Sequence, residues 1–281
     1  MKLKPVLTFA LLITALGLVA CSSDKAANDD SPQSQKNAQT ENLQSVEGMY
    51  NEAARLLDEN RYESAARGFD QVEQQYPYSQ WATRAQLMSA YAHYRDMSYD
   101  AAVLGLDRFI QLHPGNDNIA YAYYLRALSF YEQISDVRRD QKMTTLALDG
   151  LKQVVDRYPE TRYARDAALK IDLTEDHLAG KEMEIGRYYQ GREQYQAAIN
   201  RFQTVVDDYE TTTHVPEALH RLTESYLAMG IPSEARKTAA VLGHNYPDSD
   251  WYKDSYALIT GENTRPANDK SVYERTLGRI F

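Results

Sequence analysis

Residues that could catalyse a reaction or bind a metal are scattered along this chain instead of grouped. None of the six histidines pairs with another at the i, i+4 spacing that places two ligands on one helix face. The single cysteine, Cys21, has no second thiolate with which to form a zinc site. Nucleophile-elbow, phosphate-binding and dinucleotide-binding glycine motifs are all missing from the sequence. We therefore predict a protein that is not an enzyme and uses neither a metal nor a cofactor.

Cys21 has the sequence context of a lipid-attachment site. Lys2 and Lys4 precede an uncharged run, Val6 to Ala20, which is too short for a comfortable membrane span and is typical of a signal peptide. The run Leu-Val-Ala-Cys resembles the lipobox of bacterial lipoproteins, in which the cysteine carries an S-diacylglycerol and an N-acyl chain. The alternative is a secretory signal that contains a cysteine by chance. A lone cysteine makes no internal disulfide, however, and lipid attachment accounts for it.

The residues after Cys21 predict a location and a tether. Ser22, in place of Asp, resembles the signal by which enteric bacteria sort lipoproteins to the outer membrane. We expect a signal peptide at 1–20 and lipid anchoring at the periplasmic face of a Gram-negative outer membrane. Residues 22–44 have no aromatic side chain and few apolar ones, so 21–44 should be a flexible tether with a span of roughly 25–30 Å. The formal net charge of −9 argues against nucleic acid as a partner.

From Val46 onward, the apolar residues follow a helical period and repeat five times. Each repeat can be aligned on a reference alanine, and these are Ala65, Ala102, Ala147, Ala198 and Ala235. Bulky apolar residues follow in most repeats after four and seven places, and an aromatic ring or histidine follows after eleven. These positions share one helical face, so the stripe should be buried. Proline comes next in four of the five repeats and should end the helix.

An upstream helix precedes each of these helices. The third repeat carries about seven extra residues, Ser135 to Gln141, and Thr161 to Gln190 in the fourth contains no proline and predicts one helix of roughly 45 Å. Ser79, Thr161 and Ser249 are placed to cap the next helices. The pattern resembles the tetratricopeptide repeat, whose period is about 34 residues. We predict an all-α, right-handed superhelical solenoid of about five helix pairs over residues 45–260, with a concave groove.

The segment 261–281 differs from the repeats. Residues 261–270 are typical of a linker, and 271–281 place their apolar residues on one face of a short amphipathic helix. The sequence leaves open whether this helix caps the last repeat or docks onto a partner.

Tyrosine and arginine are concentrated on the first helices of the second and third repeats. The chain has 22 tyrosines against 6 phenylalanines and 2 tryptophans, and tyrosine with arginine is the composition of binding hot spots. First helices line the groove of such solenoids, although some of these side chains must belong to the core. Groove candidates are Tyr91, Tyr94, Arg95, Tyr123, Tyr124 and Arg126. His93 and His113 stand where other repeats have aromatic residues or leucine, which predicts a packing role.

The middle of the chain resembles the BamD family, the lipoprotein component of the outer-membrane β-barrel assembly (BAM) machinery. The resemblance lies in the runs 90–95 (AYAHYR), 106–114 (LDRFIQLHP) and 118–119 (NI), and it covers roughly residues 45–255. A charged insertion at 136–140 also stands where the family carries one. The resemblance is weaker at both ends of the chain.

The resemblance implies partners and site residues. BamD-like proteins hold the barrel component through its last periplasmic POTRA domain, and Asn200 and Arg201 match the family's Asn-Arg on that side. Arg201 precedes the core residue Phe202 and should point outward, free to pair with a carboxylate of the partner. The family's first repeats are thought to receive the aromatic C-terminal segment of unfolded outer-membrane proteins, and Tyr76 falls in that region. Other assembly lipoproteins are further expected partners, although the tail after Gly261 leaves their identity open.

One alternative function shares the anchor and the groove. The chain could be a tetratricopeptide lipoprotein that scaffolds another envelope machine, for peptidoglycan synthesis or a secretion pore. The two functions differ only in the partner that the groove receives.

Overall fold

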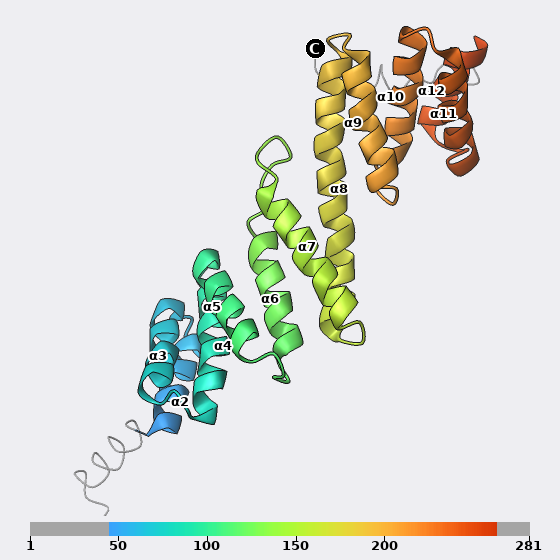
Figure 1. Ribbon diagram of the computed structural model, residues 1–281. Coiled ribbons are helices and arrows are strands. Elements are labelled where there is room, and N and C mark those ends of the chain that lie inside the picture. The colour runs from blue at the N-terminus through green and yellow to red at the C-terminus, as the bar shows by residue number, and fades with distance from the viewer. Residues whose placement is uncertain (1–44, 263–281) are drawn as a thin grey trace, which may run out of the picture. The chain divides into compact units, whose positions relative to one another are not determined.

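The computed structural model describes residues 45–262, which form eleven helices and no strand (Figure 1). The helices are α2 (Val46–Asp58), α3 (Tyr62–Gln75), α4 (Gln80–Arg95), α5 (Tyr99–Leu112), α6 (Ile119–Tyr131), α7 (Lys142–Arg157), α8 (Arg162–Gln190), α9 (Tyr195–Asp208), α10 (Val215–Ala228), α11 (Pro232–Asn245) and α12 (Asp250–Thr260). Cys21, the predicted tether and the predicted C-terminal helix lie outside these residues. Within the described range, no helix is both long and apolar enough to cross a membrane.

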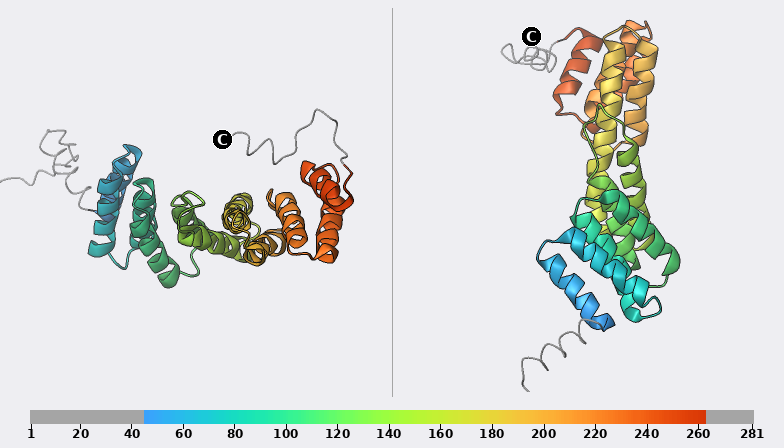
Figure 2. Two further views of the ribbon diagram at one scale, coloured as in Figure 1. Left: turned by 90° about the horizontal axis from the view of Figure 1, so that it is seen from above. Right: turned by 90° about the vertical axis from the view of Figure 1, so that its left-hand side faces the viewer.

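Each helix packs against the next one along the chain, from α2 on α3 to α11 on α12 (Figures 1 and 2). First helices of successive pairs also touch, because α2 contacts α4, α4 contacts α6, and α6 contacts α8. Contacts between near neighbours are the pattern of a repeat protein, in which each unit buries its apolar face on the next. This arrangement confirms the predicted all-α tetratricopeptide-repeat solenoid.

The buried core follows the predicted repeat. All five reference alanines have an exposed fraction of 0%. Also buried are the residues four and seven places later, which are Phe69, Leu106, Leu151, Phe202 and Ala239, and Val72, Phe109, Val154, Val205 and Leu242. The residues eleven places later differ from the prediction, because they cap the helix and stay partly exposed, as Tyr76 does at 36%. The buried stripe therefore ends one turn earlier than the sequence suggested.

Helix ends repeat as regularly as the core. The second helix of each pair is α3, α5, α7, α9 or α11. Each of them ends at a residue with φ between −129° and −135° and ψ between 44° and 58°. The fourth has this geometry at Tyr209 although Glu210 follows instead of proline, so proline reinforces the stop without being required for it. Side-chain oxygens of Ser79, Thr161 and Ser249 accept hydrogen bonds from the first turns of α4, α8 and α12, as predicted.

Small residues let the two helices of a pair approach closely. A Cβ added to Gly68 would lie 2.9 Å from the Cβ of Ala53, and one added to Gly150 would lie 3.0 Å from the Cβ of Ala127. In the fourth pair, the glycine stands on the first helix instead of the second. There Gly186 is the small residue on the first helix, and a Cβ on it would lie 2.4 Å from the ring of Phe202. Close packing of this kind leaves no space for one additional methyl group.

The third and fourth repeats depart from the others where predicted. A loop over residues 132–141 separates α6 from α7, and α8 is a single helix of 29 residues, about 43 Å long. Lys152 of α7 pairs with Glu175 of α8 at 2.8 Å, and α9 contacts a later part of α8. The loop lies against the middle of α8, with a Val137 methyl carbon 3.7 Å from where a Cβ on Gly180 would lie. Helix α8 thus carries packing partners along its whole length.

Candidate protein-binding surfaces

Five tyrosines form a row across three first helices, which we call the tyrosine face. They are Tyr91 and Tyr94 on α4, Tyr121 and Tyr124 on α6, and Tyr163 at the start of α8. Each pair on one helix is three residues apart, so both rings leave the same side of that helix. All five side chains are half-buried. The structure brings the predicted candidates Tyr91, Tyr94 and Tyr124 together here, and it adds Tyr121 and Tyr163.

Ring contacts and hydrogen bonds fix the tyrosine face. Tyr163 lies 5.3 Å from Tyr121 and 5.4 Å from Tyr124 between ring centroids. The hydroxyl of Tyr94 donates to Glu132 at 3.3 Å, and that of Tyr124 donates to Asp166. Burial and the charge of Glu132 raise the pKa of Tyr94 to about 12, and burial likewise raises the pKa values of Tyr121 and Tyr124. These rings therefore stay neutral at physiological pH, and their ring contacts and hydrogen bonds hold them in place.

Two arginines flank the row without a carboxylate partner. Arg95 donates to the hydroxyls of Tyr62, at 2.6 Å, and Tyr91, at 3.0 Å, and its guanidinium lies 4.9 Å from the Tyr62 ring centroid. Arg162 donates to the Tyr163 hydroxyl at 3.0 Å and lies over that ring. Neither joins an ion pair within the part of the chain that the structure describes, and both are exposed. Their charges remain available to an anionic group that reaches the tyrosine face.

Tyr123 and Arg126, two further predicted groove residues, lie apart from the tyrosine face. Tyr123 is 9% exposed, lies in the core with Leu151, and accepts a hydrogen bond from Arg157 at 2.6 Å. Arg126 donates to Asp107 of α5 at 2.9 Å and to Gln153 of α7 at 2.8 Å. Both side chains therefore pack α6 against its second-helix neighbours. They leave α6 on a different side from Tyr121 and Tyr124.

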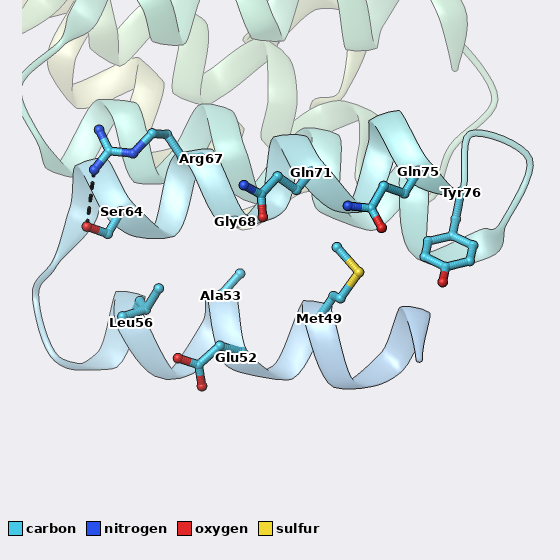
Figure 3. Close-up of a pocket in the computed structure, with 10 residues that line it drawn as sticks. All are labelled: Met49, Glu52, Ala53, Leu56, Ser64, Arg67, Gly68, Gln71, Gln75 and Tyr76. Atoms are coloured by element: carbon cyan, nitrogen blue, oxygen red, sulfur yellow. Dashed lines mark hydrogen bonds between the residues drawn. The ribbon is translucent and has the colours of Figure 1, made fainter. Parts of the chain in front are cut away.

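Tyr76, predicted as a substrate contact, lies on another surface. It lines a cavity of about 810 Å³ between α2 and α3, together with Met49, Leu56 and Gln75 (Figure 3). We call this cavity the open groove. Its residues come only from the first helix pair, and none of the tyrosine-face residues lines it. The structure thus separates Tyr76 from Tyr91, Tyr94 and Tyr124.

Asn200 and Arg201 lie side by side on the exposed side of α9. The Arg201 side chain is 44% exposed, in agreement with the expectation that it points outward. It is not unpaired, however, because its guanidinium donates to Glu182 of α8 at 3.1 Å. Glu182 also lines a cavity beside the 132–141 loop, with Arg138, Arg139 and Lys181 among its walls. The result is a mixed polar surface that is rich in exposed cations.

The first helices of the last two repeats carry a charge network that the sequence analysis missed. Arg187 of α8 contacts Glu217 of α10 at 3.0 Å, Arg221 contacts both Glu217 and Glu224, and His220 lies 3.4 Å from Glu224. His220 is 3% exposed and also contacts the Ser255 hydroxyl of α12 at 2.8 Å. The network ties α8, α10 and α12 together. Some of its contacts join residues more than 30 positions apart, so a short sequence motif does not reveal the network.

Metal and histidine chemistry can be assessed only over the described residues. No group of three or more His, Cys, Asp or Glu side chains in residues 45–262 is arranged to hold a metal ion. The His113 ring lies 5.2 Å from that of Phe109, which agrees with the predicted packing role.

Comparisons with known proteins place the chain among its relatives. A sequence model of the YfiO family, described as outer membrane lipoprotein, matches residues 43–242. A protein of Rickettsia prowazekii named outer membrane protein assembly factor BamD is 46% identical over 92% of this chain and 98% of its own length. The chain belongs to the BamD family. A protein of the same name from Caulobacter vibrioides is 44% identical over 94% of this chain and 84% of its own length.

The match to the BamD family covers both candidate surfaces. Residues 43–242 include the tyrosine face and the Asn200–Arg201 surface. The predicted resemblance is thereby confirmed, and the chain is a relative of outer membrane protein assembly factors. Among solved structures, the tetratricopeptide domain of P58(IPK) aligns with 89% of this chain and 70% of that chain, at a TM-score of 0.41 and 14% identity.

The charge network predicts a loss of stability in acid. Burial alone would raise the pKa of Glu224, but the hydrogen bond and charge of His220, together with Arg221, lower it to about 2. A carboxylate with a lowered pKa stabilises the fold above its unfolded value, 4.5, and loses this contribution as the pH falls towards 2. Glu224→Gln should therefore reduce the free energy of unfolding at pH 7 by about 1–3 kcal/mol and flatten its decline between pH 4.5 and 2.

Urea unfolding followed by circular dichroism across this pH range measures both effects. Glu63→Gln is the matched control, because the Glu63 side chain is 71% exposed. Identical pH profiles for the parent and Glu224→Gln would show that the network does not stabilise the last repeats.

Proposed function

We propose that this chain acts by binding, without catalysis, as a lipid-anchored scaffold of the β-barrel assembly complex. In this proposal the tyrosine face receives segments of unfolded outer-membrane proteins, and the Asn200–Arg201 surface holds the barrel component with its POTRA domains. The names of its relatives support an assembly role over a scaffold for peptidoglycan synthesis or a secretion pore. Other assembly lipoproteins are proposed as further partners.

The observation that carries the substrate proposal is the pairing of fixed tyrosine rings with arginines that lack carboxylate partners. Half-buried rings offer stacking surface for an aromatic side chain at little entropic cost, because they are already held in place. Among the described residues, the hydrogen bonds and ring contacts of Arg95 and Arg162 are all made with tyrosines. A guanidinium binds a carboxylate through two parallel hydrogen bonds. A segment that ends in an aromatic residue and a free carboxylate therefore fits the chemistry of this surface.

The proposal for the barrel component depends on Arg201. In the first three repeats the residue three places after the reference alanine is glycine, and in the fourth it is Arg201. The side chain reaches Glu182 at the edge of a cavity whose walls also include Leu178 and Ile185. Apolar residues within a charged rim are the usual anatomy of a protein interface. The ion pair is exposed enough to be shared with, or exchanged for, a partner carboxylate.

The tyrosine face should distinguish a free carboxylate from an amide. Arg95→Gln with Arg162→Gln should weaken binding of a peptide that ends in phenylalanine carboxylate by about thirtyfold, since the two lost charged hydrogen bonds contribute about 1 kcal/mol each at an exposed site. The same peptide with a C-terminal amide should be almost unaffected. Fluorescence anisotropy with both peptides measures the difference. Arg67→Gln is the control, because Arg67 already pairs with Glu63. Equal weakening of both peptides would exclude carboxylate recognition.

Arg201→Glu should weaken association with the POTRA-bearing barrel component by at least tenfold, because it places a second negative charge beside Glu182. Far-UV circular dichroism should not change, since an exposed ion pair contributes little to stability. The matched control is Glu182→Gln, which breaks the same ion pair but leaves the guanidinium intact. Co-purification from detergent-solubilised membranes measures both variants. If Glu182→Gln is as damaging as Arg201→Glu, the ion pair has a structural role and the proposed contact is wrong.

Lipid attachment at Cys21 is the proposed anchor, and it predicts a change in location. Three acyl chains bind a bilayer almost permanently, at about 0.8 kcal/mol for each buried CH₂ group. Cys21→Ala should therefore move the protein from the membrane fraction to the soluble periplasm. Fractionation and immunoblotting measure the distribution. Retention of Cys21→Ala in the outer membrane at the parent level would refute the lipid anchor.

A further inference from the structure

The open groove has counterparts on later helix pairs, and there a helix of the preceding pair lies against the equivalent surface. Its floor is the close contact of Ala53 with Gly68, and Met49 and Leu56 of α2 lie along it (Figure 3). Glu52 stands on the α2 side and is 39% exposed at its side chain. Equivalent positions line the second helix pair, and the floor of small residues recurs in the third. The first pair is the one that has no preceding helix pair within residues 45–262.

The second helix pair shows how this surface is filled. Its floor is the contact of Ala90 with Gly105, at 3.2 Å for an added Cβ, and helix α3 lies along it. Asp70 of α3 accepts a hydrogen bond from Ser89 at 2.6 Å. Ser89 stands thirteen places before the reference alanine of its repeat, and Glu52 stands at the same place in the first repeat. A helix is therefore the element that fits this surface.

The third helix pair repeats the arrangement with a stronger contact. Its floor is Ala127 against Gly150, and the incoming helix is α5. Asp107 of α5 occupies the place of Asp70, and Arg126 occupies the place of Ser89. The two form an ion pair at 2.9 Å. In both pairs, an aspartate on the incoming helix meets a hydrogen-bond donor on the first helix of the pair.

In the first pair, this place holds a carboxylate, where the second and third pairs have a hydrogen-bond donor. Glu52 is an acceptor, so an incoming aspartate would be repelled and an incoming lysine or arginine would be attracted. Glu52 already contacts Arg55 at 2.6 Å, but both side chains are exposed, and such a pair can be shared with a second cation. Residues 22–44 have no aromatic side chain and few apolar ones with which to fill the groove. The occupant must therefore have a different composition.

We infer that the open groove is a docking site for an amphipathic helix of a partner protein, which packs on α2 and borders α3, as α3 packs on α4 and pairs with Arg108 of α5 through Glu73. The partner helix carries small and apolar residues towards Ala53 and Gly68 and a lysine or arginine over Glu52. Met49 supplies an adaptable wall, and Tyr76 closes the end of the groove near Gln75. Tyr76 is thereby assigned to the recognition of this helix, apart from the tyrosine face.

Helix α3 itself supplies the probe. A stapled helical peptide with the sequence of residues 62–76 is made in two forms, one unchanged and one with Asp70→Lys. The Asp70→Lys peptide should bind the full chain about fivefold tighter than the unchanged peptide, as measured by fluorescence anisotropy in detergent. In the Glu52→Lys variant this preference should reverse. Gln71→Trp, an exposed position on the groove wall, should prevent binding of both peptides.

Glu63→Lys is the control for the charge reversal, because Glu63 is exposed on α3 but does not line the groove. It should leave the preference between the peptides unchanged. A preference that survives Glu52→Lys, or the absence of binding by either peptide, would overturn the inference. So would a dimer of the full chain, seen by analytical ultracentrifugation, that Glu52→Lys dissociates, because the occupant would then be a second copy. None of these outcomes depends on the tyrosine face or on Arg201.

Discussion

The close approach of paired helices at small residues is the constraint on which the rest of this structure depends. Alanine or glycine stands at the crossing point on both helices of the first three pairs, so backbones meet almost without intervening side chains. This contact sets the orientation of each pair, and the pair in turn sets which side of the first helix faces its neighbours. The tyrosine face and the buried Tyr123 lie on different sides of α6, and the open groove lies between α2 and α3. Their different environments follow from that one crossing geometry.

The two ends of the stack use the equivalent helix sides differently. On α4, α6 and the start of α8 these sides carry tyrosines, with Arg95 and Arg162 bonded only to rings and hydroxyls in the described region. On the end of α8 and on α10 they carry arginines and glutamates that neutralise one another. A surface whose charges are already paired gains little from an ionic partner. Binding of an anionic segment is thus favoured on the first repeats, and the last repeats are fixed internally.

Much of the fold could be predicted from the sequence, because the signal is periodic and local. The reference alanines, the capping Ser79 and Thr161, and the unbroken helix after Thr161 all depend on spacings within one helix. The groove residues were harder, since Tyr123 and Tyr124 are adjacent and leave α6 about 100° apart. The loop before α7 made the first helix of the third repeat difficult to align. Ala127 precedes its reference alanine, Ala147, by twenty residues, whereas Ala90 precedes Ala102 by twelve. The salt bridge of Arg201 depends on Glu182 in another helix, which no spacing reveals.

Helix α8 joins the halves of the stack in a way that ordinary repeats do not. The other helices have 11 to 16 residues and each belongs to one unit, so adjacent units exchange stability only through their side chains. Here one unbroken ladder of backbone hydrogen bonds runs from Tyr163, at the tyrosine face, to Arg187, in the charge network. Fraying that started in either half would have to unwind a helix that the other half still holds. The two halves therefore share a single cooperative unit at their junction, and neither can lose its end of α8 without loosening the packing of the other.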